Sequence, residues 1–334
     1  MIELEISQEH LLMHESLFFG NNKKKKKRLY RKLEAIVQSE KQIVIKRIFK
    51  WIFDNIEHII LGDIEVLSLA KAEFNIYIKQ LSKIDLQYLF SKLGIFLDEY
   101  DYFIKASEWN AYKFQRELGI TVCPYCNTQF VFVYEHEEAG RTRATLDHFY
   151  DKATYPFLAV SIYNLVPSCK VCNSDLKNTK KTDISTHYSP YEKSILENLK
   201  IKRQVGNMFN KSESDEVDYV GSILGVNEDF DIIFDYPKDN SIVSNKIKGN
   251  IELFHLDKIY NHFHKTYVQD IIKKSIIYNE AYLNQLKFSN TIIFNNEEHL
   301  RNSLFMPKEN DKVNILGKLT RDIIESEITY RYNK

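Results

Sequence analysis

Apolar residues recur at steps of three and four positions through the amino-terminal third of the chain, which is the spacing of an amphipathic α-helix. Two stretches show this spacing most clearly, IVIKRIFKWIFDNIEHII and DLQYLFSKLGIFLDEYDYF. A further helix is predicted in SEWNAYKFQREL, with Ser107 as its N-cap and Gly119 as the left-handed residue after its last turn. The pattern therefore predicts a helical amino-terminal domain over residues 1–118.

From residue 119 to 186 the pattern changes to an alternation of apolar and polar positions, which is typical of β-strands. TQFVFVY and TRATLDHF both alternate in this way, and Gly140 between them suits a tight turn. The sequence therefore predicts a β-hairpin, followed by a loop and by a short helix that begins near Cys169.

The remaining residues, 187–334, show mixed patterns. The segment SESDEVDYVGSILGVNEDFDIIFDYPKDN is acidic, and its charge would repel a phosphate backbone. A long amphipathic helix is predicted in DKIYNHFHKTYVQDIIKKSIIYNEAYLNQL and another helix near LGKLTRDIIESEITY. Three histidines of this region are assigned no role, because amphipathic helices commonly carry such side chains on a solvated face: His255, His262 and His264. The predicted fold class is α+β and predominantly helical, with a mixed, mainly helical carboxy-terminal region.

Composition limits the classes of function. A chain of 334 residues suits two or three domains, and its share of apolar residues, 44%, provides sizeable cores. The formal net charge is zero, so a general positive field does not hold this protein on nucleic acid, and such contact requires local patches or a bound cation. One patch is the basic run from Lys23 to Lys32, which is either a solvated loop with a first helical turn or an arm that contacts phosphates.

The location of the protein is expected to be the cytoplasm. No basic leader precedes an apolar stretch near residue 1, and no apolar run approaches the length of a membrane span. We therefore expect a soluble protein with no membrane partner. Thiols stay reduced in the cytoplasm, so the cysteines are expected to be metal ligands or core residues before they are disulfides.

All four cysteines fall in two pairs, CPYC (Cys123 and Cys126) and CKVC (Cys169 and Cys172). A two-residue gap lets both thiolates of a pair reach one tetrahedral ion, and two such pairs complete a closed zinc site. The alternatives are a redox CxxC and ordinary core cysteines. A redox pair does not require a second pair, and core cysteines would not occur only in pairs. The prediction is a structural Zn²⁺ that takes no part in chemistry.

Four polar residues lie between these pairs or directly beside them. Asp147 and His148 stand together in ATLDHFYDK, Asn164 precedes the second pair, and Asn173 follows the last cysteine. In its order and spacing the stretch CPYCNTQF…TLDHFYDK…YNLVPSCKVCNSDLK resembles the HNH nucleases, also called ββα-metal nucleases, in their zinc-binding form. The resemblance implies a central ββα-metal module over residues 119–186.

The resemblance also implies a role for each of these residues. His148 is expected to be the general base, and Asn164 is expected to brace the loop that positions it. Asp147 and Asn173 are expected to bind one catalytic cation. The family often has histidine at the last position, and asparagine there provides an oxygen donor, which shifts the expected metal to Mg²⁺ or Mn²⁺.

These residue types meet the requirements of phosphodiester hydrolysis. A neutral imidazole, with an ordinary pKa near 6.5, accepts the proton of an attacking water at cellular pH. A hard cation supplies positive charge where the transition state is negative. Three lysines after Asn173 are candidates to hold flanking phosphates, with a solvated helical face as the equal alternative: Lys177, Lys180 and Lys181.

The predicted function is that of a metal-dependent HNH endonuclease that cuts DNA and leaves a 5′-phosphate and a 3′-hydroxyl, as the family does. The central stretch also looks like the HNH proteins of prokaryotic anti-phage defence or restriction, including the HNH component of Septu-type systems. That likeness implies a partner ATPase or another defence-system protein. The alternatives are a catalytically inactive zinc-binding protein that binds nucleic acid or acts as a scaffold, and a nuclease that cuts RNA. The target site, the trigger and the oligomeric state do not follow from the sequence.

Overall fold

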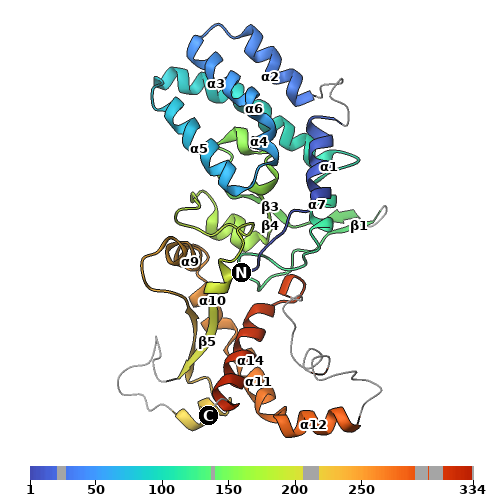
Figure 1. Ribbon diagram of the computed structural model, residues 1–334, viewed down its shortest axis with the longest axis vertical. Helices are drawn as coiled ribbons and strands as arrows, with labels where there is room; N and C mark the ends of the chain where they lie inside the picture. Colours follow the sequence, from blue (N-terminus) through green and yellow to red (C-terminus); the bar gives the residue numbers. More distant parts are fainter. Residues whose placement is uncertain (21–27, 137–139, 206–217, 290–299, 301–310, 333–334) are drawn as a thin grey trace. The chain divides into compact units, whose positions relative to one another are not determined.

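The protein is a predominantly helical α+β protein with small antiparallel sheets (Figure 1). The computed structural model describes all residues except 21–27, 137–139, 206–217, 290–299, 301–310 and 333–334. Residues 23–27 of the basic run and the first part of the acidic segment therefore lie outside the described residues.

The chain divides into two compact units. We call residues 3–124 and 131–193 the amino-terminal unit, and residues 1–2, 125–130 and 194–334 the carboxy-terminal unit. The three domains expected from the sequence stay a prediction. Within the described ranges, no helix combines the length and the apolar character that crossing a membrane requires.

The amino-terminal unit is built largely from helices. Its described helices are α1 (Gln8–Phe18), α2 (Arg28–Ser39), α3 (Ile43–Asp54), α4 (Ile56–Leu61), α5 (Ile64–Ile78), α6 (Lys83–Lys105) and α7 (Ala111–Glu117). Helices α4, α5 and α6 contact two short 3₁₀ helices, η1 (Pro156–Leu158) and η2 (Ile162–Asn164) (Figure 1). Phe157 of η1 is fully buried there, with its ring centroid 5.9 Å from that of Trp51 and 4.6 Å from that of Phe74. The segment between η1 and η2 is therefore part of the core of this unit.

Helix α7 is shorter than the sequence predicts. It begins at Ala111, because the side chain of Asn110 accepts hydrogen bonds from two backbone amides of the first turn, at 2.9 and 3.0 Å. The prediction that Ser107 caps this helix was therefore wrong. Gly119 follows its C-cap with a φ of 63°, so the left-handed residue at the carboxyl end is confirmed.

Two separate strand pairs are present, and the first of them joins the ends of the two predicted strands, with Tyr134 opposite Thr142. They are β1 (Tyr134–His136) with β2 (Gly140–Thr142), and β3 (Thr145–His148) with β4 (Leu165–Ser168), both antiparallel. β1 and β2 are exposed throughout, whereas β3 and β4 are largely buried. The strand that carries Asp147 and His148 thus pairs with another buried strand, and its predicted pairing with TQFVFVY was wrong. In the observed register Asp147 lies opposite Val166, and His148 lies opposite Leu165.

A π-helix, η3 (Val171–Lys177), follows β4 where the sequence predicts a short helix. The wider repeat of this helix includes a hydrogen bond from the amide of Asn178 to the carbonyl of Asn173, at 2.9 Å. π-Helical turns are rare and occur frequently at functional sites. η3 contacts β3, so the predicted site residues lie on neighbouring elements.

The described part of the carboxy-terminal unit contains an antiparallel pair of strands and several helices. Its described elements are β5 (Lys200–Val205), α8 (Tyr219–Ile223), β6 (Phe230–Asp235), α9 (Ile242–Leu253), α10 (Leu256–Phe263), α11 (Lys265–Ile277), α12 (Glu280–Ser289) and α14 (Gly317–Tyr332). β5 pairs with β6 and packs against α14, and α14 packs against α11 (Figure 1). The buried carboxylate of Asp322 on α14 accepts a hydrogen bond from the amide of Ile201 at 2.9 Å and pairs with Lys318 at 2.9 Å. These bonds fix the position of β5 against α14.

The long helix predicted after residue 257 is divided into α10, α11 and α12, so its continuity was predicted wrongly. His264 lies between α10 and α11 with a φ of −122°, which is outside the helical range. α10 contacts α9 and β6, whereas α11 contacts α14. Because the helix is interrupted at His264, the apolar faces of α10 and α11 pack against different elements of the unit. The final predicted helix is present as α14.

Candidate functional site

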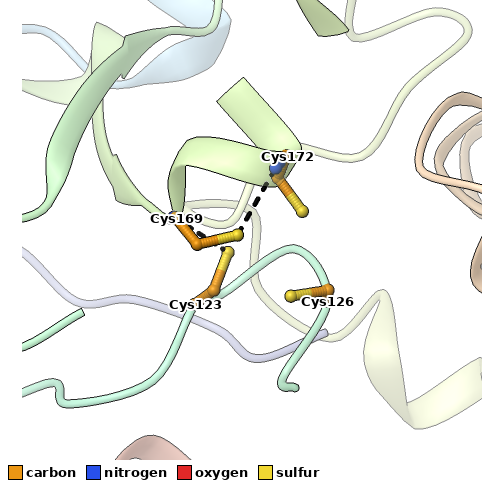
Figure 2. Close-up of side chains that lie close together, drawn as sticks. All are labelled: Cys123, Cys126, Cys169 and Cys172. Atoms are coloured by element: carbon orange, nitrogen blue, oxygen red, sulfur yellow. Dashed lines mark hydrogen bonds between the residues drawn. The ribbon is translucent and has the colours of Figure 1, made fainter. Parts of the chain in front are cut away.

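The four cysteines form a buried cluster. Their Sγ atoms all lie within 4.8 Å of one another, and Figure 2 shows the side chains directed toward a common centre. The backbone amide of Cys169 donates to the Sγ of Cys123, and the amide of Cys172 donates to the Sγ of Cys169, both at 3.4 Å. Such amide donors favour the thiolate form, because they place partial positive charge beside the sulfur.

The cluster is compatible with a structural metal such as zinc. A tetrahedral site with Zn–S bonds of about 2.3 Å holds its sulfurs about 3.8 Å apart, which lies within the observed limit. Four sulfur donors favour zinc over hard cations such as Mg²⁺. The most exposed of the four side chains, Cys169, is 7% exposed, so the cluster is closed to a substrate. A metal bound there would connect the segment after α7 to the beginning of η3.

Asp147 is engaged in a buried ion pair at the end of β3. The Nζ of Lys177 lies 2.8 and 2.7 Å from the two carboxylate oxygens of Asp147, and 2.7 Å from the carbonyl oxygen of His148. Asp147 is 4% exposed and Lys177 is 2% exposed. Lys177 was predicted from the sequence as a candidate phosphate contact on a helix surface. The packing of η3 against β3 instead turns this side chain inward, onto Asp147.

His148 is buried with one defined hydrogen-bond partner. Its Nε2 lies 3.0 Å from the carbonyl oxygen of Ala159, and the ring of Tyr100 lies against it edge-on at a centroid distance of 4.7 Å. A carbonyl only accepts hydrogen bonds, so Nε2 carries the proton and Nδ1 of the neutral ring carries the lone pair. The pKa of His148 is lowered to about 4, mainly by burial and next by the positive charge of Lys152, while the hydrogen bond to Ala159 and the charge of Asp147 oppose this effect. The ring is therefore neutral at pH 7, in a form that can accept a proton at Nδ1.

Asn164 holds together the two segments on either side of this ring. Its Oδ1 accepts from the amide of Tyr150 at 2.6 Å, and its Nδ2 donates to the carbonyls of Tyr150 at 3.0 Å and Leu158 at 2.9 Å. Asn164 is fully buried. The same side chain thus ties the loop after His148 to the segment that contains Ala159.

The other predicted residues lie on or after η3. Asn173 is half-buried, and its backbone amide donates to the carbonyl of Cys169 at 3.0 Å. Lys180 and Lys181 are exposed, as a phosphate contact requires and as a solvated face also predicts. The roles predicted for these residues, a metal ligand for Asn173 and phosphate contacts for Lys180 and Lys181, therefore stay predictions.

The predicted divalent cation does not fit the site as it is arranged. Both oxygens of the Asp147 carboxylate already accept hydrogen bonds from the ammonium group of Lys177, which balances the charge that would attract Mg²⁺ or Mn²⁺. Binding of such an ion at Asp147 and Asn173 therefore requires Lys177 to leave the carboxylate. The cation that the structure places at Asp147 is an ammonium group.

Two residues beside His148 were not assigned to the site from the sequence. Tyr100 comes from α6, and its pKa is raised to about 12 by burial, so it stays protonated. Lys152 lies in the loop after β3 with its Nζ 4.4 Å from the centroid of the Tyr100 ring. Burial lowers the pKa of Lys152, and the nearby acids Asp101 and Asp151 oppose this effect. The position of Lys152 four residues after His148 was a weak signal in the sequence, whereas Tyr100 had none.

A cavity of about 810 Å³ lies elsewhere in the amino-terminal unit. Residues of α1 and of the segment from Tyr102 to Trp109 line it, and none of the predicted site residues does. The cavity is therefore not the place where the chemistry predicted for His148 would occur.

No family model, no curated protein and no solved structure matches this chain. The functional argument therefore depends on the residues themselves and on the contacts described above.

Proposed function

We propose that the protein is a nuclease of the HNH type that hydrolyses DNA phosphodiester bonds with His148 as the general base. The observation that carries the proposal is the state of His148, a neutral ring whose Nε2 is held by the Ala159 carbonyl and whose Nδ1 is the proton acceptor. The proposal includes a role in prokaryotic anti-phage defence or restriction beside a partner ATPase, for which the support is the resemblance of the central stretch alone.

The proposed reaction begins with proton transfer. Nδ1 of His148 accepts a proton from a water molecule while the water oxygen attacks phosphorus, and the bond from phosphorus to the 3′-oxygen of the preceding nucleotide breaks. The products are a 5′-phosphate and a 3′-hydroxyl, the latter after the leaving oxygen takes a proton. General-base catalysis of this kind contributes about 10²- to 10⁴-fold to a rate.

Positive charge near the base supports the binding of a phosphodiester. The ammonium group of Lys152 lowers the pKa of His148, whereas the charge of Lys177 is balanced by Asp147. An anionic phosphate beside His148 would be attracted by Lys152. Mg²⁺ or Mn²⁺ at Asp147 and Asn173 is implied by the resemblance, but it does not fit while Lys177 is bound to Asp147, and the proposed reaction does not include it.

A cleavage assay tests the proposal. Supercoiled plasmid is incubated with the wild-type protein, with His148→Ala and with His58→Ala, a change of an exposed histidine on α4 that serves as the matched control. The reactions contain Mg²⁺, Mn²⁺ or EDTA. Cleavage by the wild type and the control, with a loss of about 10²-fold or more in His148→Ala, is the expected result. Equal cleavage by His148→Ala would exclude His148 as the base.

A second candidate function is that of a nucleic-acid-binding or scaffold protein with an inactive module. The ion pair between Asp147 and Lys177 favours it, because it neutralises the carboxylate that the resemblance assigns to a metal. Absence of cleavage by all three proteins in the presence of partners, together with a mobility shift of labelled duplexes, would select this candidate. Matched DNA and RNA duplexes in the same assay would decide between DNA and RNA as the substrate.

A further inference from the structure

The turn between η1 and η2 has an unusual set of hydrogen bonds. Three consecutive backbone carbonyls each accept a bond from a buried side chain: Leu158 from Asn164 Nδ2 at 2.9 Å, Ala159 from His148 Nε2 at 3.0 Å, and Val160 from His14 Nε2 at 2.7 Å. The next residue, Ser161, donates from its hydroxyl group to the carbonyl of Ile59 on α4 at 2.6 Å. The orientation of the carbonyl that holds the proposed base is thus determined by side chains from several distant segments.

His14 supplies the bond next to that carbonyl. It belongs to α1 and is fully buried, and its Nδ1 accepts a hydrogen bond from Nε1 of Trp109 at 3.0 Å. An indole nitrogen only donates and a carbonyl only accepts, so the ring must carry its proton on Nε2 and must be neutral. Both ring nitrogens have a partner, which leaves a single tautomer and a single orientation.

The backbone connects this ring to His148. The carbonyls of Ala159 and Val160 belong to successive peptide planes that meet at the Cα of Val160, and each plane is rigid. When His14 holds the second carbonyl and His148 holds the first, the dihedral angles of Val160 are fixed. Release of the second carbonyl would free the first plane to rotate, and the partner of His148 Nε2 would no longer be held in place.

We propose that His14 and Trp109 are positioning residues for His148, and that they fix its tautomer through the Ala159–Val160 turn. This inference rests on the proposed function for its consequence in catalysis, but the positioning itself is a property of the folded chain. Neither residue is expected to touch the substrate. The amino-terminal helix α1 would then be required for the chemistry of a motif that begins more than a hundred residues later.

The experiment uses selective ¹⁵N-histidine labelling of the full chain, with the His148 signals assigned by their loss in His148→Gln. In the wild type at pH 7.5, His148 is expected to show one protonated nitrogen, Nε2. In His14→Leu, which removes both bonds, a second population protonated at Nδ1 is expected. The single-turnover cleavage rate is expected to fall about 10- to 100-fold with little change in substrate affinity, because a small misplacement of a catalytic group has effects of that size.

Two variants separate positioning from folding. His14→Gln keeps an N–H donor that can reach Val160 and is expected to restore both the single tautomer and most of the rate. Trp109→Phe keeps the aromatic ring and removes only the indole donor, so it carries the test if His14→Leu does not fold. His58→Leu on α4 is the matched histidine control.

The proposal is overturned if His148 keeps its single tautomer in folded His14→Leu or Trp109→Phe, or if His14→Gln behaves as His14→Leu does. A wild-type protein that cuts no nucleic acid would remove the proposed function instead. In that case the tautomer of His148 still decides whether His14 and Trp109 position it.

Discussion

The cysteine cluster and the turn around His148 are built in different ways, although both were predicted from one stretch of sequence. The cluster takes all its donor atoms from two short CxxC segments. The ring of His148 takes its carbonyl partner from the turn after η1 and its aromatic neighbour from α6, and the charges that act on it belong to Lys152, Asp147 and Lys177. Metal binding therefore depends on a few sulfur atoms that the sequence already identifies. The protonation state of an imidazole ring depends instead on contacts from many parts of the chain.

The comparison also separates two sources of stability. A structural zinc site contributes its binding energy to folding directly. The turn depends on hydrogen bonds that each contribute about 1 kcal/mol and on buried charges that are costly when one partner is lost. The predictions below test each side of this difference.

Loss of one sulfur ligand is expected to have the largest effect. Cys169→Ser should release the metal and unfold the central segment, since metal binding in isolated zinc fingers amounts to about 10–16 kcal/mol. Metal content by mass spectrometry and far-UV circular dichroism measure the two effects. Ser174→Ala, an exposed change on η3, is the control. A folded, zinc-free Cys169→Ser protein would contradict the structural role.

Removal of one charge from the buried ion pair is the next largest change. Lys177→Met should lower the free energy of unfolding by about 3–5 kcal/mol, because it leaves the Asp147 carboxylate buried without its partner. The double variant Lys177→Met/Asp147→Asn should recover part of this loss. Denaturant unfolding measures both, with Lys180→Met at an exposed site as the control. Equal stability of Lys177→Met and Lys180→Met would show that the pair is not formed.

Acidification is expected to test the buried histidine of α1. Burial lowers the pKa of His14 from 6.5 to about 4, so the folded state binds fewer protons than the unfolded state between these values. The corresponding stability is present above pH 6.5 and is lost as the pH falls toward 4, in total about 3 kcal/mol. Unfolding free energies at several pH values should show a loss that is about 3 kcal/mol larger in the wild type than in His14→Gln, because His148, whose pKa is lowered in the same way, contributes equally to both. His58→Gln is the control. Parallel pH curves for the wild type and His14→Gln would argue against a neutral, buried His14.

The smallest predicted change concerns divalent cations. If Lys177 competes with a metal for Asp147, folded Lys177→Met should bind Mn²⁺ about tenfold or more tightly than the wild type, which corresponds to about 1.4 kcal/mol. Electron paramagnetic resonance of free Mn²⁺ measures the affinity, and the double variant with Asp147→Asn should abolish the gain. Equal affinities in the wild type and Lys177→Met would remove the competition.

Several features of the fold were predictable because they depend on neighbouring residues. Gly119 follows the C-cap of α7 with a positive φ as expected, and a short helix, η3, begins at Val171, within the second cysteine pair. The N-cap of α7 was misplaced because two residues near its start are both good caps, and only the backbone path shows that Asn110 is used. The pairing of β3 with β4 was missed because alternation identifies strands without identifying their partners.

The residues of the candidate site also differ in how far the sequence predicts them. Cys123, Cys126, Cys169 and Cys172 were recognisable from spacing alone, because sulfur donors two residues apart can reach one ion whatever surrounds them. Lys177 looked like a surface residue, since a lysine in a polar run is usually solvated, and only the π-helical packing against β3 places it on Asp147. His14 and Trp109 carried no signal at all, because their contacts cross most of the amino-terminal unit.

Residue identity and short-range spacing were thus enough to establish a helical α+β chain with a four-cysteine cluster and a group of polar residues beside it. The three-dimensional fold was needed to establish the protonation state of His148, the partner of Asp147 and the link from α1 to the turn at Ala159. The physical reason is the range of the interactions. Helix periodicity and ligand spacing operate within a few residues, whereas burial, hydrogen-bond direction and charge pairing are set by atoms that only folding brings together.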